Sequence, residues 1–157
     1  MNTGKIPTGM TALTPFLTVK DVDQAVTFYE KAFGFTKKFA MPGPEGKTVH
    51  AEMLHGGCTI MLGGESLQCG TKAPASSEPV ACSLYLYVED VDRFFQHATT
   101  NGAKVKQPCT DMFWGDRLCS LTDPFGHHWS FGTHVREVKP EDMQKAMREQ
   151  MKQATHA

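Results

Sequence analysis

The chain has 157 residues, 40% of them hydrophobic, with 16 basic and 17 acidic side chains. This length suits one domain or two small units that share a core, and the composition is typical of a folded globular protein. A net charge of −1 excludes a strongly basic chain and gives no indication of electrostatic binding to nucleic acid or anionic membranes, so we expect neither partner.

The N-terminus and the cysteines indicate where the protein resides. The first ten residues contain one lysine and lack the apolar core of a signal peptide, and no apolar run approaches the roughly 20 residues that span a bilayer. The five cysteines cannot all pair within one chain, and none lies in a Cys-x-x-Cys motif. We therefore expect free thiols in a reducing compartment and a cytoplasmic location.

The first half of the chain predicts one strand, one helix and three further strands. After a flexible segment at 1–10, hydrophobic periodicity predicts a strand at 13–19, a helix at 22–33 and strands at 36–41, 48–54 and 58–63. Asp21 can cap the helix N-terminus, and Gly34 is placed to end the helix in a left-handed conformation. Residues 11–64 are thus predicted to form a first module.

The same order returns 69 residues later in the sequence. The pentapeptide at 19–23, Val-Lys-Asp-Val-Asp, reappears at 88–92 as Val-Glu-Asp-Val-Asp. A second module, 81–135, is predicted with a strand at 82–88, a helix at 91–101 and strands at 104–107, 117–122 and 127–133. A connector at 65–80, rich in Gly, Ser and Pro, joins the modules.

A C-terminal helix is predicted within 136–157. Pro140 and the acids that follow it are typical of a helix start. Met143, Met147 and Met151 recur every four residues and lie on one helix face. That face either packs on its own chain or forms an arm that reaches a second subunit.

A duplicated strand–helix–three-strand unit resembles the vicinal oxygen chelate superfamily, which includes glyoxalases, bleomycin-resistance proteins and dioxygenases. The segments that carry the resemblance are 16–22, 28–29, 33–35, 49–53, 113–117 and 123–127, and they are most similar to the PhnB-like branch. The resemblance implies an α+β fold with two βαβββ modules forming a curved mixed sheet around a cup, plus the C-terminal helix. It also implies a homodimer, in which modules pair within or between chains.

The resemblance further implies where a metal would be held. In that superfamily two ligands come from each module, and the corresponding positions here are Thr14, Met61, Ser83 and Ser130. Neutral hydroxyls and a thioether are poor ligands for Zn, Ni, Mn or Fe. We therefore expect no metal, no cofactor and no glyoxalase or dioxygenase activity of the usual type.

Hairpin registers predict which side chains face the cup. A two-residue Gly-Gly turn places Glu52 opposite Met61 and His50 opposite Gly63, on one face of the sheet. A register with Leu121 opposite Ser130 places Arg117 and Cys119 on the inner face, and Leu13 is expected under the helices. The predicted ligand-binding residues are Thr14, Phe16, His50, Glu52, Met61, Ser83, Tyr85, Trp114, Arg117, Cys119, His128 and Ser130.

These residues predict metal-independent binding of a small aromatic or polar organic molecule in the cup, with Trp114 and Tyr85 stacking on it. One alternative is a lyase or isomerase of the same superfamily. It would use Glu52 as a catalytic base, or a displaced metal held by His50, Glu52 and His128. Two further possibilities are a structural ion pair between Glu52 and Arg117, and a dimerisation module that binds no ligand.

Overall fold

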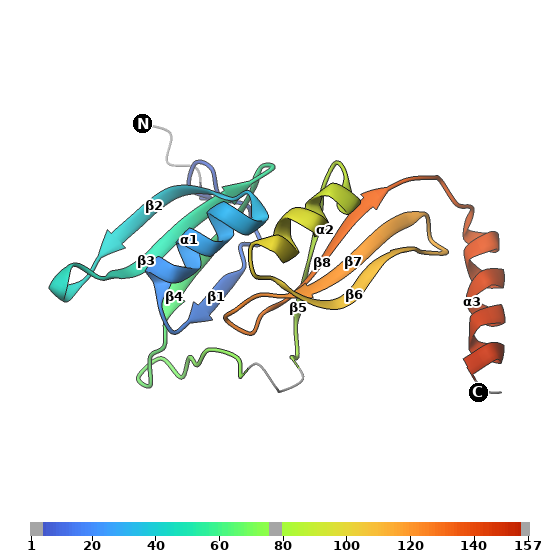
Figure 1. Cartoon of the computed structure of the whole chain (residues 1–157). Helices are drawn as coiled ribbons and strands as arrows, with labels where there is room; N and C mark the ends of the chain where they lie inside the picture. Colours follow the sequence, from blue (N-terminus) through green and yellow to red (C-terminus); the bar gives the residue numbers. More distant parts are fainter. Residues whose placement is uncertain (1–4, 76–79, 155–157) are drawn as a thin grey trace.

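The computed structural model describes residues 5–75 and 80–154 and contains two βαβββ modules followed by a helix (Figure 1). Parts of the predicted flexible N-terminus (1–4), connector (76–79) and C-terminal helix (155–157) lie outside the described residues. The first module contains β1 (Phe16–Val19), α1 (Val22–Phe33), β2 (Thr36–Pro42), the short turn η1 (Pro44–Gly46), β3 (Thr48–His55) and β4 (Cys58–Gly64). The second contains β5 (Ser83–Tyr87), α2 (Val91–Thr100), β6 (Lys104–Asp111), β7 (Asp116–Thr122) and β8 (His128–His134), and α3 (Pro140–Ala154) follows.

Each module forms a mixed four-stranded sheet, with strand orders β1-β4-β3-β2 and β5-β8-β7-β6. The first strand of each module pairs in parallel with the last, and the other pairings are antiparallel. The predicted fold class, two βαβββ modules with a C-terminal helix, is confirmed.

The helix caps follow from the local sequence. Asp21 accepts a hydrogen bond from the Gln24 N–H at 2.9 Å, and Asp90 accepts one from the Arg93 N–H at the same distance. Gly34 ends α1 with φ 70°, a conformation that side chains with a Cβ rarely adopt.

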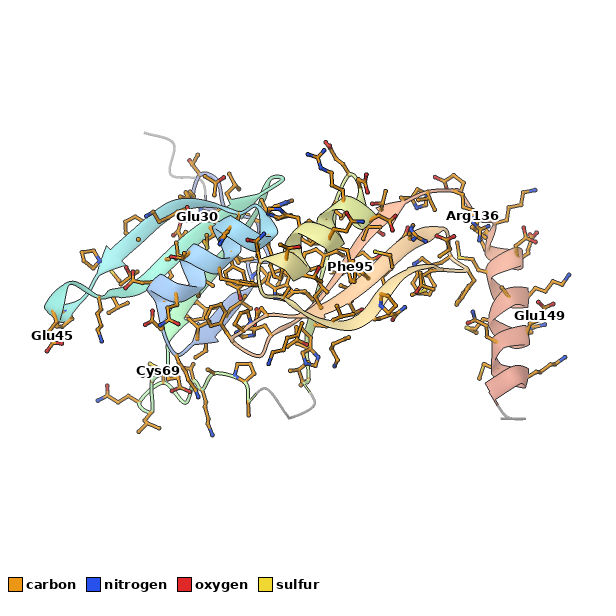
Figure 2. The ribbon with its side chains drawn as sticks, viewed as in Figure 1. Glu30, Glu45, Cys69, Phe95, Arg136 and Glu149 are labelled. Atoms are coloured by element: carbon orange, nitrogen blue, oxygen red, sulfur yellow. The ribbon has the colours of Figure 1, made fainter. Side chains whose placement is uncertain are left out.

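The two modules share one core, formed by the sheet faces that the helices cover (Figure 2). Tyr29 and Phe33 of α1 pack on Trp129 of β8 with ring centroids 5.7 and 5.4 Å apart, and Phe33 also contacts Phe131 at 4.9 Å. Burying each such side chain contributes roughly 1.5–3 kcal/mol to stability. The opposite sheet faces, called the inner faces below, are turned away from this core.

The N-terminal end of the first strand differs from the prediction. Strand β1 begins at Phe16, and Leu13 is 85% exposed rather than packed under a helix. Thr14 donates its side-chain hydroxyl to the Thr11 carbonyl at 2.8 Å, so a local turn replaces the strand pairing there.

Helix α3 lies at the end of the molecule beyond the second module, away from α1, α2 and the sheets (Figure 1). Met147 and Met151 on its predicted apolar face are exposed. This placement favours the interpretation of α3 as an arm that reaches a second subunit. The second subunit itself stays a prediction. No helix within the described residues is long and apolar enough to cross a membrane.

Candidate functional site: the inner faces of the two sheets

The inner face of the first module has the predicted register. Glu52 lies opposite Met61 and His50 opposite Gly63, and Phe16 of β1 pairs with Met61 on the other side of β4. The imidazole of His50 stacks against the Phe16 ring with centroids 5.9 Å apart and planes 29° apart. The predicted grouping of Phe16, His50, Glu52 and Met61 on one face is confirmed, whereas Thr14 precedes the strand.

The predicted register of the β7–β8 hairpin was wrong by one residue. Leu121 lies opposite Trp129 rather than Ser130, because Asp123 belongs to the turn and accepts the N–H groups of Phe125 and His127, each at 2.9 Å. A one-residue shift exchanges the two faces of a strand. Cys119 is accordingly buried in the core.

Arg117 also lies on the helix side of its sheet, so its predicted place in the cup was wrong. Its guanidinium contacts Asp92 of α2 at 2.7 Å and Asp111 at 2.9 Å. The ion pair with Glu52, one of the possibilities that the sequence left open, is not formed. Glu52 instead accepts from Lys38 Nζ at 3.0 Å, across the β2–β3 pair.

The inner face of the second module brings together four predicted residues and one that was missed. Ser83 pairs with His128 and Tyr85 with Ser130 across β5–β8, and Ser120 lies opposite Ser130 across β7–β8. The hydroxyl oxygens of Ser120 and Ser130 are 3.2 Å apart. A pocket of about 320 Å³ is lined by the two serines, by Ser83 and by His128, whereas Tyr85 lies outside its lining. The correct hairpin register would have found Ser120.

An aromatic ring lies across a glycine on each inner face. A Cβ on Gly63 would lie 2.4 Å from Phe16 Cζ, and one on Gly132 would lie 2.4 Å from the Tyr85 hydroxyl oxygen. The repeat relates the two pairs, because Tyr85 follows Phe16 by 69 residues and Gly132 follows Gly63 by the same number. Phe16 is 52% and Tyr85 45% exposed, so each ring presents a broad apolar surface to solvent.

A buried carboxylate, also missed from sequence, holds aromatic residues at one end of the second inner face. Asp116 accepts from the hydroxyls of Tyr85 (2.8 Å) and Tyr87 (3.0 Å), from Trp114 Nε1 (3.2 Å) and from His134 Nδ1 (2.8 Å). Burial alone would raise the pKa of Asp116, but these hydrogen bonds lower it below its usual value. The charged carboxylate therefore fixes the orientations of Tyr85 and Trp114.

The residues at the superfamily's metal positions do not fit a divalent ion. Thr14 is engaged with Thr11, and Met61, Ser83 and Ser130 offer a thioether and two neutral hydroxyls. Within 5–75 and 80–154, no cluster of three or more His, Cys, Asp or Glu side chains could hold a metal. The alternative metal set of His50, Glu52 and His128 is therefore not brought together in the described part of the chain.

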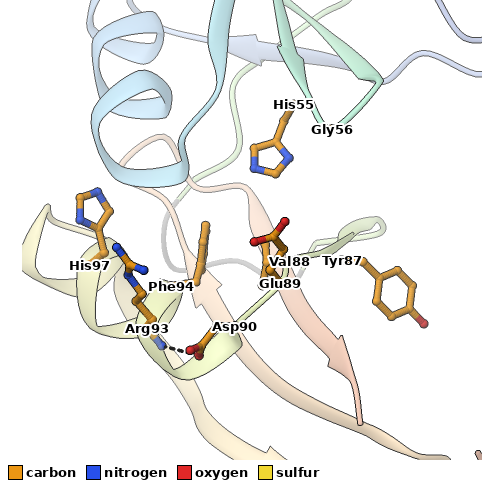
Figure 3. Close-up of a pocket in the computed structure, with 9 residues that line it drawn as sticks. All are labelled: His55, Gly56, Tyr87, Val88, Glu89, Asp90, Arg93, Phe94 and His97. Carbon is orange, nitrogen blue, oxygen red and sulfur yellow. Dashed lines mark hydrogen bonds between the residues drawn. The ribbon is translucent and has the colours of Figure 1, made fainter. Parts of the chain in front are cut away.

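A larger pocket, of about 610 Å³, lies outside the inner faces, between the β3–β4 hairpin and the start of α2 (Figure 3). Two of its polar groups serve the fold: Asp90 caps α2, and His97 Nε2 bonds the Lys31 carbonyl at 2.7 Å. His55 Nδ1 is buried without a hydrogen-bond partner among the described residues, and burial lowers the pKa of this imidazole.

Comparisons with known proteins agree with this architecture. The family model of the glyoxalase/bleomycin resistance protein/dioxygenase superfamily matches residues 10–131. The chain belongs to this superfamily. An uncharacterized protein of Mycobacterium bovis is 44% identical over 142 residues, covering 88% of this chain and 93% of that protein.

Two solved structures of the superfamily fold illustrate the similarity. TioX from Micromonospora sp. ML1 is 30% identical, covers 80% of this chain and 99% of its own, and has a TM-score of 0.64. A glyoxalase/bleomycin resistance protein/dioxygenase from Nocardioides is 24% identical, with coverages of 89% and 91% and a TM-score of 0.58, and shows the fold alone.

Proposed function

We propose that this superfamily member binds a small, planar organic molecule on its inner faces without a metal ion. The observation that carries the proposal is the pair of half-exposed rings, Phe16 and Tyr85, laid across Gly63 and Gly132 at equivalent positions of the two modules. Exposed ring faces bind planar ligands by stacking, and neighbouring polar groups orient them. Membership of the PhnB-like branch and a cytoplasmic location are parts of the same proposal.

The lyase or isomerase alternative has less support from the site. Lys38 occupies one oxygen of the Glu52 carboxylate, and the donors around it do not complete a metal site. Binding without chemistry requires only the aromatic surface and the polar groups beside it.

The complete cup, in this proposal, forms between two copies of the chain. Within one chain the modules pack through their helix-covered faces, so both inner faces are turned outward. Each carries exposed apolar side chains, at Phe16, Phe39 and Met41 in the first module and at Tyr85 and Tyr87 in the second. A homodimer would place the first inner face of one copy against the second inner face of the other, covering these side chains.

Calorimetric titration with the uncharged planar probe 2-naphthamide tests the binding function. We expect saturable binding to the wild-type protein and loss of at least about tenfold in affinity in Phe16→Ala and Tyr85→Ala. Leu13→Ala is the matched control, because Leu13 is exposed but lies before β1 and off the inner face. Equal affinity in all four proteins would contradict the proposal.

Elemental analysis of the purified protein separates binding from metal-dependent chemistry. We expect no stoichiometric divalent metal. Stoichiometric metal that disappears in Glu52→Ala would favour the enzymatic alternative. Light scattering on a size-exclusion column measures the mass in solution, and a mass of one chain would contradict the cup formed between copies.

A further inference from the structure

Each sheet contains a bulged lysine at the same place in its second strand. In β2 the pairing skips Lys38, between Lys37 opposite Met53 and Phe39 opposite Glu52. In β6 it skips Lys106, between Val105 opposite Leu121 and Gln107 opposite Ser120. A bulge turns an extra side chain toward one face, and here it brings both Lys106 and Gln107 to the inner pocket.

The two lysines differ in their partners. Lys38 forms an ion pair with Glu52 at 3.0 Å. The equivalent of Glu52 in the second module is Ser120, because each pairs with the residue that follows the bulge. Across the described part of the chain, no carboxylate lies within ion-pair distance of Lys106, whose hydrogen bond goes to His128 Nδ1 at 3.2 Å.

This contact settles which nitrogen of His128 carries the proton. An ammonium group only donates, so Nδ1 must accept and the proton of the neutral imidazole is on Nε2. Burial and then the positive charge of Lys106 lower the pKa of His128, which keeps the imidazole neutral at pH 7. Lys106 keeps two further protons to donate.

The remaining polar side chains of the pocket can donate hydrogen bonds and carry no negative charge, and Trp129 lines it as well. Ser83, Ser120, Ser130 and Gln107 line it with Lys106 and His128, and no acidic residue does. The nearby Asp123 is compensated by four donors: the Tyr29 hydroxyl, Trp129 Nε1 and two backbone N–H groups. The pocket therefore has one uncompensated positive charge surrounded by hydroxyl, amide and imidazole donors.

We propose that this pocket, which includes Ser83 and Ser130 from the four superfamily metal positions, is an oxyanion site that binds the carboxylate or phosphoryl group of the ligand. The inference rests on the proposed function, since the aromatic surfaces of the cup would hold the body of the same ligand. Lys106 supplies the charge and the serine hydroxyls direct their protons to the anionic oxygens. Such charge-assisted hydrogen bonds are shorter and stronger than neutral ones.

A pair of probes that differ only in charge tests the site. We expect 2-naphthoate to bind the wild-type protein about tenfold or more tightly than 2-naphthamide. Lys106→Met should abolish the preference for the acid, so that acid and amide bind with about equal affinity. Ser120→Glu should have the same effect, because the new carboxylate would pair with Lys106 as Glu52 pairs with Lys38. Lys104→Met, on the same strand but outside the pocket, is the control.

Equal affinities for acid and amide in the wild-type protein, or an unchanged preference in Lys106→Met, would overturn the oxyanion site while leaving the aromatic binding function intact. Inorganic phosphate tests the oxyanion site independently of the proposed aromatic binding, because it has no planar group to stack on the rings. Phosphate should shift the amide NMR signals of Ser120 and Ser130 in the wild-type protein and not in Lys106→Met. Unshifted signals, with no acid preference, would also overturn it.

Discussion

The Tyr29 hydroxyl of α1 donates to the carboxylate of Asp123, in the turn between β7 and β8, at 2.7 Å. This buried contact joins the two modules across 94 residues of sequence. Trp129 Nε1 donates to the same carboxylate oxygen at 2.9 Å. Burial raises the pKa of Tyr29 far above its usual value, so the phenol stays protonated and remains a donor. The pair holds the turn in the conformation that sets the hairpin register.

Removal of the Tyr29 hydroxyl should destabilise the protein strongly. In Tyr29→Phe the buried Asp123 loses one of two donors on that oxygen, and a hydrogen bond to a charged group contributes about 1.5–3 kcal/mol. The free energy of unfolding, measured by urea titration, should fall by about that amount.

Tyr87→Phe is the matched control for this change. Its hydroxyl also bonds a buried carboxylate, but Tyr87 is exposed and Asp116 keeps three other donors. We expect a loss of less than about 1 kcal/mol. An equal loss in both variants would show that Tyr29 and Asp123 have no special role in joining the modules.

The two glycines beneath the aromatic rings should be required for binding. In Gly63→Ala and Gly132→Ala the new Cβ would lie 2.4 Å from Phe16 and from Tyr85, so each ring must move off its strand. We expect affinity for 2-naphthamide, measured by calorimetry, to fall by about tenfold. Gly64→Ala, where a Cβ meets nothing within 4 Å, should bind normally. Undiminished binding in Gly132→Ala would show that the Tyr85 surface is not used.

His134 should titrate above its ordinary value. Its hydrogen bond to Asp116, assisted by Glu137, raises the pKa of the imidazole. Because the folded value exceeds the unfolded value of about 6.5, the stabilisation is complete below that pH and is lost as pH rises through the folded value. An NMR titration should show a lower His134 midpoint in Asp116→Asn and a smaller decrease in Glu137→Gln. An identical midpoint in Asp116→Asn would contradict this assignment.

The cysteines should differ sharply in reactivity. None of the five forms a disulfide, and Cys58, Cys69 and Cys82 are exposed. Burial raises the pKa of the Cys119 thiol to about 12 and also raises that of Cys109. A thiol reagent at pH 8, followed by mass spectrometry, should label the exposed three quickly, Cys109 slowly and Cys119 only after unfolding. Rapid labelling of Cys119 would mean that it lies accessible on the inner face and not in the buried core.

The sequence alone determined the features that depend on neighbours along the chain. Hydrophobic periodicity and the repeat predicted the eight strands and the helices, and Asp21 and Asp90 cap the helices they precede. The Gly-Gly turn set the first hairpin register correctly, because a two-residue turn leaves one way to pair its strands. The poor fit of the superfamily's metal positions to a divalent ion also follows from sequence alone, since it depends only on which residue types stand there.

Only the tertiary structure decided which side chains share a face in the second module and which charges are compensated. The β7–β8 turn is longer, so its register depends on Asp123 and on the distant Tyr29 that bonds it. That register moved Arg117 and Cys119 to the helix side and Ser120 to the inner face. The pairing of Lys38 with Glu52, and of Lys106 with His128 in place of any acid, depends on strands brought together by folding, which no spacing in the sequence specifies.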